Sequence, residues 1–181
     1  MSVKEQLLDV AEAMVREGGY NNFSFRDLAD KVGIKSASVH YHFKTKPDLG
    51  VELVRRYTAR FLQTLDTAAS TPEQADAAPQ AIVQRGFRDA LHSSGMMCLC
   101  GLLAAEGDGL PPEVRQATRA FFEGTQQWLA ERIAQQSGTT PEHAAQQALR
   151  QMAMLEGAML MAKIHDDLSL FDQITGAVSD K

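Results

Sequence analysis

The sequence predicts an all-α protein, and three features of the chain lead to this prediction. Apolar residues recur at the three- and four-residue spacing of an amphipathic helix along most of the 181 residues. Glycine, proline and capping residues separate these segments, as they do where helices begin and end. No stretch alternates apolar and polar residues as a half-buried strand does, and no internal repeat is present.

The N-terminal third is expected to form four helices, the second and third of them short. Their predicted ranges are residues 3–17, 25–32, 36–43 and 47–69. Ser24 and Asp27 form a variant of the capping box at the start of the second helix. Gly33 ends that helix, Ser36 is expected to cap the third, and Pro47 stands in the first turn of the fourth, where proline is tolerated.

The remainder of the chain is expected to form five more helices, two of which are long. A polar stretch of small residues, 69–79, interrupts the chain first, and "GDGLPP" at 107–112 forms a later loop. The predicted helices cover residues 81–93, 96–106, 112–136, 141–164 and 168–174.

Composition narrows the class of protein. An apolar fraction of 44% and a charged fraction of 23% are typical of a globular protein, and no apolar run approaches the length of a membrane span. We therefore expect a cytoplasmic protein without membrane contact. Cys98 and Cys100 are too close in sequence for a useful disulfide, so reduced thiols are expected.

Charge is distributed unevenly along the chain. The formal net charge is -5, yet residues 1–60 carry ten Lys/Arg against eight Asp/Glu. Residues 31–47 contain four lysines, two histidines and no carboxylate. An anionic partner is therefore expected to meet the N-terminal end.

The acid-free segment lies within the outline of a helix-turn-helix, in which the second helix presents polar side chains to base edges. Val39 and Phe43 fall on the face that packs inward. The outward residues expected in the groove are Lys35, Ser36, Ala37, Ser38 and Tyr41. Those expected near phosphates are Ser24, His40, His42, Lys44, Thr45 and Lys46.

The stretch "FSFRDLADKVGIKSASVHYHFKTKPDL" resembles the DNA-binding domain of the TetR family of transcriptional regulators. The residues that fit the family pattern directly are Gly33, Val39, His42, Phe43, Lys46 and Leu49. His40 departs from it, because the family usually has tyrosine there, although an imidazole keeps a hydrogen-bond donor.

The resemblance implies a ligand-responsive regulator, usually a repressor, that binds a double-stranded DNA operator as a homodimer. It implies a DNA-binding domain over residues 1–46 and a regulatory domain over residues 47–181, with no cofactor. A small-molecule effector would bind in the regulatory domain, and the two long helices, 112–136 and 141–164, are the expected dimer contacts. Candidate effector-binding residues are Met96, Cys98, Cys100, Phe121, Phe122, Trp128, Met152 and Glu156.

Three other interpretations remain weaker. His40 and His42 stand two apart on a predicted helix, so their imidazoles point in nearly opposite directions and do not favour a metal site. Cys98 and Cys100 fit buried apolar positions better than a sensor of oxidants or electrophiles. A hydrolase built from His92, Cys98 and Glu106 lacks any catalytic motif, so an enzyme is not expected.

Overall fold

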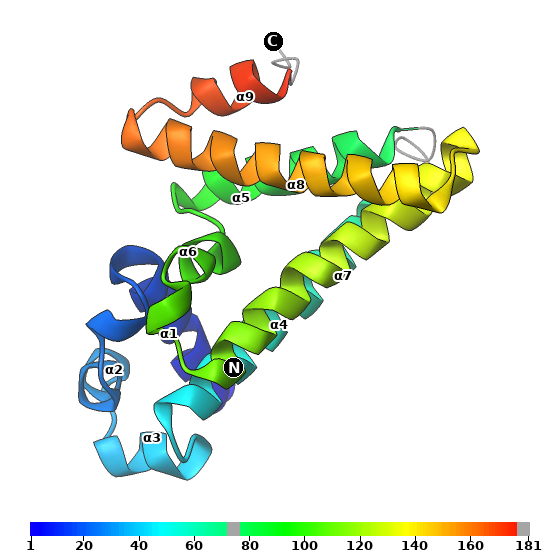
Figure 1. The fold of residues 1–181 in the computed structure, drawn as a ribbon. Helices are drawn as coiled ribbons and strands as arrows, with labels where there is room; N and C mark the ends of the chain where they lie inside the picture. Colours follow the sequence, from blue (N-terminus) through cyan, green and yellow to red (C-terminus); the bar gives the residue numbers. More distant parts are fainter. Residues whose placement is uncertain (72–76, 177–181) are drawn as a thin grey trace. The chain divides into compact units, whose positions relative to one another are not determined.

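The computed structural model describes residues 1–71 and 77–176, which are helical with connecting turns and contain no strand (Figure 1). The all-α prediction is confirmed. The helices are α1 Val3–Gly18, α2 Phe25–Val32, α3 Ser36–His42, α4 Lys46–Ala69, α5 Pro79–Ser94, α6 Leu99–Ala105, α7 Pro112–Ser137, α8 Pro141–Ile164 and α9 Ser169–Thr175. Two short 3₁₀ turns, η1 Tyr20–Asn22 and η2 Gly107–Gly109, complete the order.

Most predicted helix ends agree with the structure to within two residues, and two local expectations were wrong. The helix predicted from residue 96 begins at Leu99, because Gly95 ends α5 in the left-handed conformation and the Met96 N–H donates to the Ser94 hydroxyl instead. The N-cap of α3 is Lys35, which makes no side-chain cap bond, so Ser36 is the first helical residue rather than the cap. Residues 72–76 of the predicted polar break lie outside the described residues.

The chain divides into two compact units. Unit 1 comprises residues 1–58 and 99–121, and unit 2 comprises the described residues of 59–98 and 122–181. Helices α4 and α7 each begin in unit 1 and end in unit 2. Among the described residues, no helix combines the length and the apolar character that a membrane span requires.

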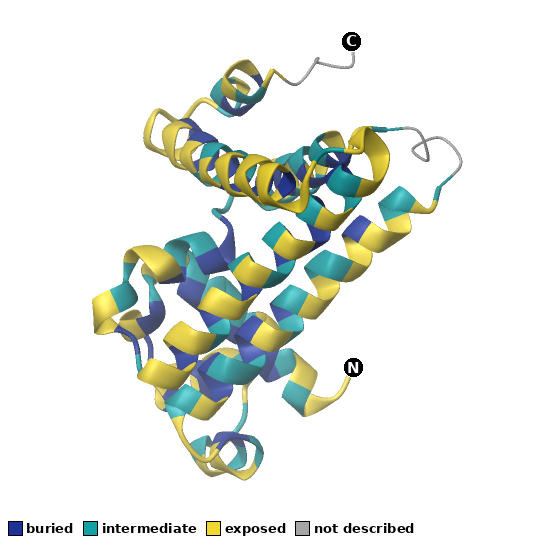
Figure 2. Cartoon of the chain, turned by 45° about the vertical axis from the view of Figure 1, so that its right-hand side comes forward, coloured by how far each residue is buried: buried dark blue, intermediate teal, exposed yellow. Residues whose placement is uncertain are grey.

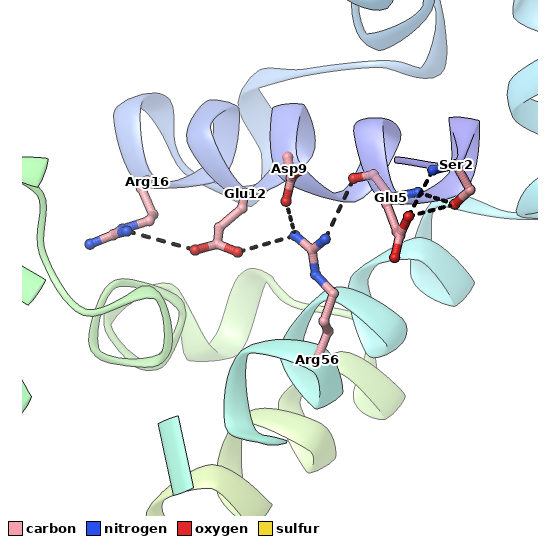
Figure 3. A network of polar contacts seen from close by, with 6 residues as sticks. All are labelled: Ser2, Glu5, Asp9, Glu12, Arg16 and Arg56. Atoms are coloured by element: carbon pink, nitrogen blue, oxygen red, sulfur yellow. Dashed lines mark hydrogen bonds and ion pairs between the residues drawn. The ribbon is translucent and has the colours of Figure 1, made fainter. Parts of the chain in front are cut away.

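Unit 1 is held together by an apolar core and one polar network. Leu7, Leu28 and Leu53, from three different helices, are each at most 1% exposed, and burying a leucine contributes roughly 2 kcal/mol. Figure 3 shows how Arg56 of α4 reaches α1, where its guanidinium lies 2.8 Å from Asp9 and 3.4 Å from Glu12. The network fixes α1 along the first half of α4.

Unit 2 has its own core and two polar ties between helices. The Trp128 indole N–H and the Arg132 guanidinium both donate to Asp66 Oδ1, at 2.8 and 2.9 Å, which joins α7 to the end of α4. Arg88 of α5 donates two hydrogen bonds to Asp172 of α9, at 2.7 and 2.9 Å. Helix α8 buries residues at three- and four-residue spacing, including Ala148, Met152, Leu155 and Met159.

Candidate nucleic-acid interface and effector region

Helices α2 and α3 are joined by a tight turn that the sequence encodes at both ends of α2. The Ser24 hydroxyl accepts from the Asp27 N–H at 3.3 Å, while the Asp27 carboxylate accepts from the Ser24 N–H at 2.8 Å, so the predicted capping box is confirmed. At the other end, Gly33 has φ +77° and donates to the carbonyl of Ala29 at 2.9 Å. Residues that carry a side chain rarely adopt this backbone conformation, so glycine suits the turn.

Helix α3 has one buried face and one exposed face. Val39 and Phe43 are 0% and 2% exposed and pack inward, as predicted. Tyr41 is 86% exposed, an unusual value for an aromatic side chain. Such a residue is available for stacking or hydrogen bonding with a partner.

The candidate DNA-contacting residues form three groups in the structure. Those with exposed side chains on or next to α3 are Lys35, Ala37, His40, Tyr41 and Lys44, and those that are half-buried are Ser36, Ser38 and His42. The His40 ring packs edge-on against Phe25 with centroids 4.9 Å apart, so α2 supports it. Ser24 and Thr45 remain exposed, but both hydroxyls serve as helix caps.

Two carboxylates near the acid-free segment are held by caps. Asp27 is bound by Ser24, whose hydroxyl and backbone N–H hold the pKa of this carboxyl below its usual range. Asp48 accepts from the Thr45 hydroxyl at 2.8 Å and from the Thr45 N–H at 3.0 Å, which caps α4. Asp30, directly before the segment, is exposed, but residues 31–47, which include α3, carry cations, hydroxyls and imidazoles and no acid, which suits a polyanion.

Lys46 differs from the other cationic candidates. Its ammonium donates to the Phe23 carbonyl and lies over the rings of Tyr20 and Phe23, 4.9 and 4.4 Å from their centroids. Burial lowers the pKa of Lys46, although Glu106 and Asp27 oppose that effect. These contacts support a role in joining η1 to the start of α4, and a phosphate contact by Lys46 stays a prediction.

The carboxylate of Glu106, the residue after α6, fixes the turn between α1 and η1, a contact that the sequence did not reveal. Glu106 Oε1 and Oε2 accept from the Tyr20 N–H at 3.0 and 3.2 Å, across 86 positions of chain. A Cβ on Gly19, which has φ +87°, would lie 2.5 Å from Glu106 Oε1. In the sequence, the glycine pair at residues 18–19 indicates a helix end and no more.

The same contact bears on the hydrolase interpretation. Because the Glu106 carboxylate is bound to a backbone N–H, it is not placed to orient a catalytic histidine. Cys98 and Cys100 are buried, at 2% and 0% exposure, which agrees with their interpretation as small apolar residues. In the described part of the chain, no group of three or more His, Cys, Asp or Glu side chains is arranged to hold a metal ion.

The candidate effector-binding residues are divided between the two units. Cys100 and Phe121 lie in unit 1, where both are 0% exposed. The Phe121 ring lies tilted against the Tyr57 ring, with the two ring centroids 5.6 Å apart. The others, in unit 2, are Met96, Cys98, Phe122, Trp128, Met152 and Glu156. Trp128 donates its indole N–H to Asp66, and the Arg132 guanidinium lies over its ring, 3.9 Å from the centroid.

Glu156 and Cys98 are brought together inside unit 2. Burial raises the pKa of the Glu156 carboxyl to about 7, and the nearby Cys98 thiol, a weak donor, opposes this only in part. Both carboxylate oxygens are buried, and neither accepts a hydrogen bond of full geometry from any described residue. A carboxyl group in this state is an exception among buried polar groups, most of which are paired.

The fold and the exposed α3 surface define a protein of the helix-turn-helix class, and comparisons with known proteins identify its family. Residues 7–53 match the family model described as bacterial regulatory proteins, tetR family. Residues 75–177, more than half of the chain, match the model of the C-terminal domain of LmrA/YxaF-like transcriptional regulators. The chain therefore belongs to the TetR family of transcriptional regulators.

Individual relatives agree with this assignment. A TetR transcriptional regulator from Legionella pneumophila has a similar structure, with a TM-score of 0.88 and 30% identity, covering 97% of this chain and 95% of that one. The transcriptional regulator AcuR of Cereibacter sphaeroides is 27% identical over 88% of this chain and 77% of its own. The transcriptional repressor KstR2 of Mycolicibacterium smegmatis is 36% identical, but the match spans only 40% of this chain and 38% of the repressor.

Proposed function

We propose that the protein is a transcriptional repressor that binds operator DNA as a homodimer and is released when a small molecule binds its helical C-terminal part. The observation that carries this proposal is the exposed, acid-free surface of α3 behind a capped α2 and a glycine turn. The description of KstR2 as a repressor supports repression rather than activation.

In this proposal α3 lies in the major groove. Lys35, Ser36, Ala37, Ser38 and Tyr41 read base edges, and the exposed Ala37 and Tyr41 stand two residues from the buried Val39, on the opposite side of the helix. The phosphates on either side are held by Ser24, His40, His42, Lys44 and Thr45. Lys46 contributes by fixing the start of α4, since its ammonium is engaged with Phe23.

Dimer formation is proposed through α7 and α8. Leu149, Leu160, Met161 and Ile164 of α8 are 44–74% exposed, a high exposure for large apolar side chains. Ala153 and Gly157 are also exposed and, by their spacing, lie on the same face. Figure 2 shows exposed positions recurring along α8. An apolar helix face of this kind is suited to a second copy, which would cover it in a four-helix contact.

Effector binding in the regulatory domain, residues 47–181, is proposed to release the DNA-binding domain, residues 1–46, from the operator. The two domains share no flexible linker, because α4 begins at Lys46 and continues to Ala69. A ligand that shifts α4 would change the separation of the two α3 helices in a dimer. Half-sites spaced by one helical turn tolerate little such change. Because its ligand is DNA, the protein is expected to act in the cytoplasm.

DNase footprinting on the DNA that flanks the gene for this protein tests the proposal. We expect one protected site with a roughly palindromic sequence, and protection that weakens steeply as salt rises. Lack of protection at low salt on that DNA, and on a pool of random duplexes, would refute it.

A further inference from the structure

Glu156 is the buried group in unit 2 that the proposed function leaves without a role. It stands on α8, one turn after Met152 and three residues before Met159, which are 2% and 0% exposed. Residues at these spacings share one side of a helix, so apolar, flexible side chains flank the carboxyl group. Glu156 as a whole is half-buried, whereas both of its carboxylate oxygens are fully buried.

The carboxylate is short of partners within the described chain. Neither oxygen has a hydrogen-bond partner of full geometry there, and only the weak donor Cys98 affects it. Several hydroxyl groups of the helices are paired: Thr58, Thr118 and Ser137 each donate to the carbonyl four residues earlier, at 2.7 to 2.9 Å. The Tyr20 and Thr125 hydroxyls are buried without a hydrogen-bond partner, as Glu156 is, but among the described residues Glu156 is the one carboxyl group in this state.

Two kinds of partner are excluded by the geometry. A second copy of the chain cannot reach the carboxylate oxygens, because both are already covered within a single copy. A metal ion needs several ligands, and among the described residues no cluster of three or more His, Cys, Asp or Glu is present. A small molecule that enters unit 2 is subject to neither limit.

We propose that Glu156 is the anionic contact of an internal binding site that takes the protonated nitrogen of an organic cation with an apolar body. A positive charge offsets the desolvation of a buried carboxylate, which a neutral donor does only in part. The flanking methionines accommodate apolar groups of varied shape. In the proposed function such a cation is the effector, but binding itself can be measured without DNA.

The pH dependence of binding has a defined sign. A cation binds the ionised carboxylate, and the pKa of Glu156 is about 7, so affinity should rise with pH. The ionised fraction grows about tenfold between pH 6 and pH 8 for such a group. On the helices that pack on α8, Arg88 and His92 of α5 act on Asp172 of α9. Neither these groups nor Arg85 and Asp89 of α5 are among the causes that shift the pKa of Glu156.

The test uses the full chain without DNA and three sets of matched probes. 2-Phenylethylamine and 4-phenylbutylamine are compared with the corresponding alcohols and carboxylates by isothermal calorimetry. Fluorescence of Trp128, the one tryptophan of the sequence, provides a second signal from unit 2. We expect the amines to bind, about tenfold more tightly at pH 8 than at pH 6, and the alcohols and carboxylates to bind at least tenfold more weakly than the amines at pH 8.

Two variants separate the site from general effects. Glu156→Gln, which keeps size and polarity, should weaken amine binding at least about tenfold and remove its pH dependence. Glu123→Gln removes an exposed carboxylate of α7 and should bind as the wild type does. Absence of amine binding, equal binding of amine and alcohol, or unchanged binding by Glu156→Gln would overturn the proposal.

Failure of the amine site and failure of the proposed repressor function give different results. If amines bind through Glu156 but the protein protects no DNA, the site stands and the repressor proposal falls. If the protein binds an operator but no amine, the reverse holds.

Discussion

Replacing Glu156 by glutamine should stabilise the protein, and the gain should grow as pH rises. Burial raises the pKa of Glu156 from 4.5 to about 7, so the folded chain binds this proton more tightly than the unfolded chain does. The stabilising contribution of the protonated carboxyl is therefore complete below about pH 4.5 and is lost as pH rises through about 7. Glutamine carries no such proton and loses nothing over the same range.

The magnitude follows from the two pKa values. Their difference, at 1.36 kcal/mol per pH unit, corresponds to about 3 kcal/mol in total. About 2.5 kcal/mol of this falls between pH 5 and pH 8. For a chain of this size, that amounts to a difference in Tm of about 5 to 10 °C.

Urea unfolding of both proteins at pH 5, 6, 7 and 8, followed by circular dichroism, measures the effect. Other titrating groups cancel in the difference between variant and wild type. Glu123→Gln serves as control and should stay within about 0.5 kcal/mol of wild type at every pH. A difference between Glu156→Gln and wild type that does not change with pH would show that the carboxyl group is solvated, and would refute the reasoning.

Three further predictions concern the turn, the recognition helix and the dimer. Gly19→Ala should lower the free energy of unfolding in urea by about 1 to 3 kcal/mol, because its backbone has φ +87° and the added Cβ would displace the Glu106 carboxylate. The control Gly107→Ala, whose Cβ would meet open space, should change this free energy little. His40→Tyr should keep operator affinity within about threefold by fluorescence anisotropy, because a tyrosine ring retains both the contact with Phe25 and a donor; a larger loss would mean that the imidazole itself is required. Leu149→Arg combined with Leu160→Arg should give monomers in sedimentation velocity, since it places charges on an exposed apolar face; an intact dimer would exclude that face.

Local signals in the sequence predicted local structure well. The Ser24 capping box, the Gly33 turn and the inward position of Val39 were all predicted from neighbouring residues, and the structure confirms them. The helix predicted from residue 96 starts later because Met96, Met97 and Cys98 extend the apolar run without being helical. Gly95 ends α5, and the Ser94 hydroxyl accepts from the Met96 N–H.

Contacts between distant residues were beyond prediction from sequence. Glu106 meets Tyr20 across 86 positions, and nothing in either neighbourhood indicates the pairing. Lys46 fitted a family pattern, but only the structure places its ammonium on Phe23. Glu156 is a candidate effector-binding residue from the sequence, but the burial of its carboxyl group beside Cys98 depends on how unit 2 packs.

The central claim is that α3 binds DNA, and operator affinity of a surface variant tests it most directly. Lys35→Ala combined with Tyr41→Ala removes two exposed side chains of this region, and Arg85→Ala removes an exposed cation of α5 as a control. Fluorescence anisotropy is measured with a duplex that the wild type selects from a random pool. We expect the α3 variant to bind at least about tenfold more weakly and the control to bind as the wild type does. Equal affinity of all three proteins, or failure of the wild type to select any duplex, would contradict the account.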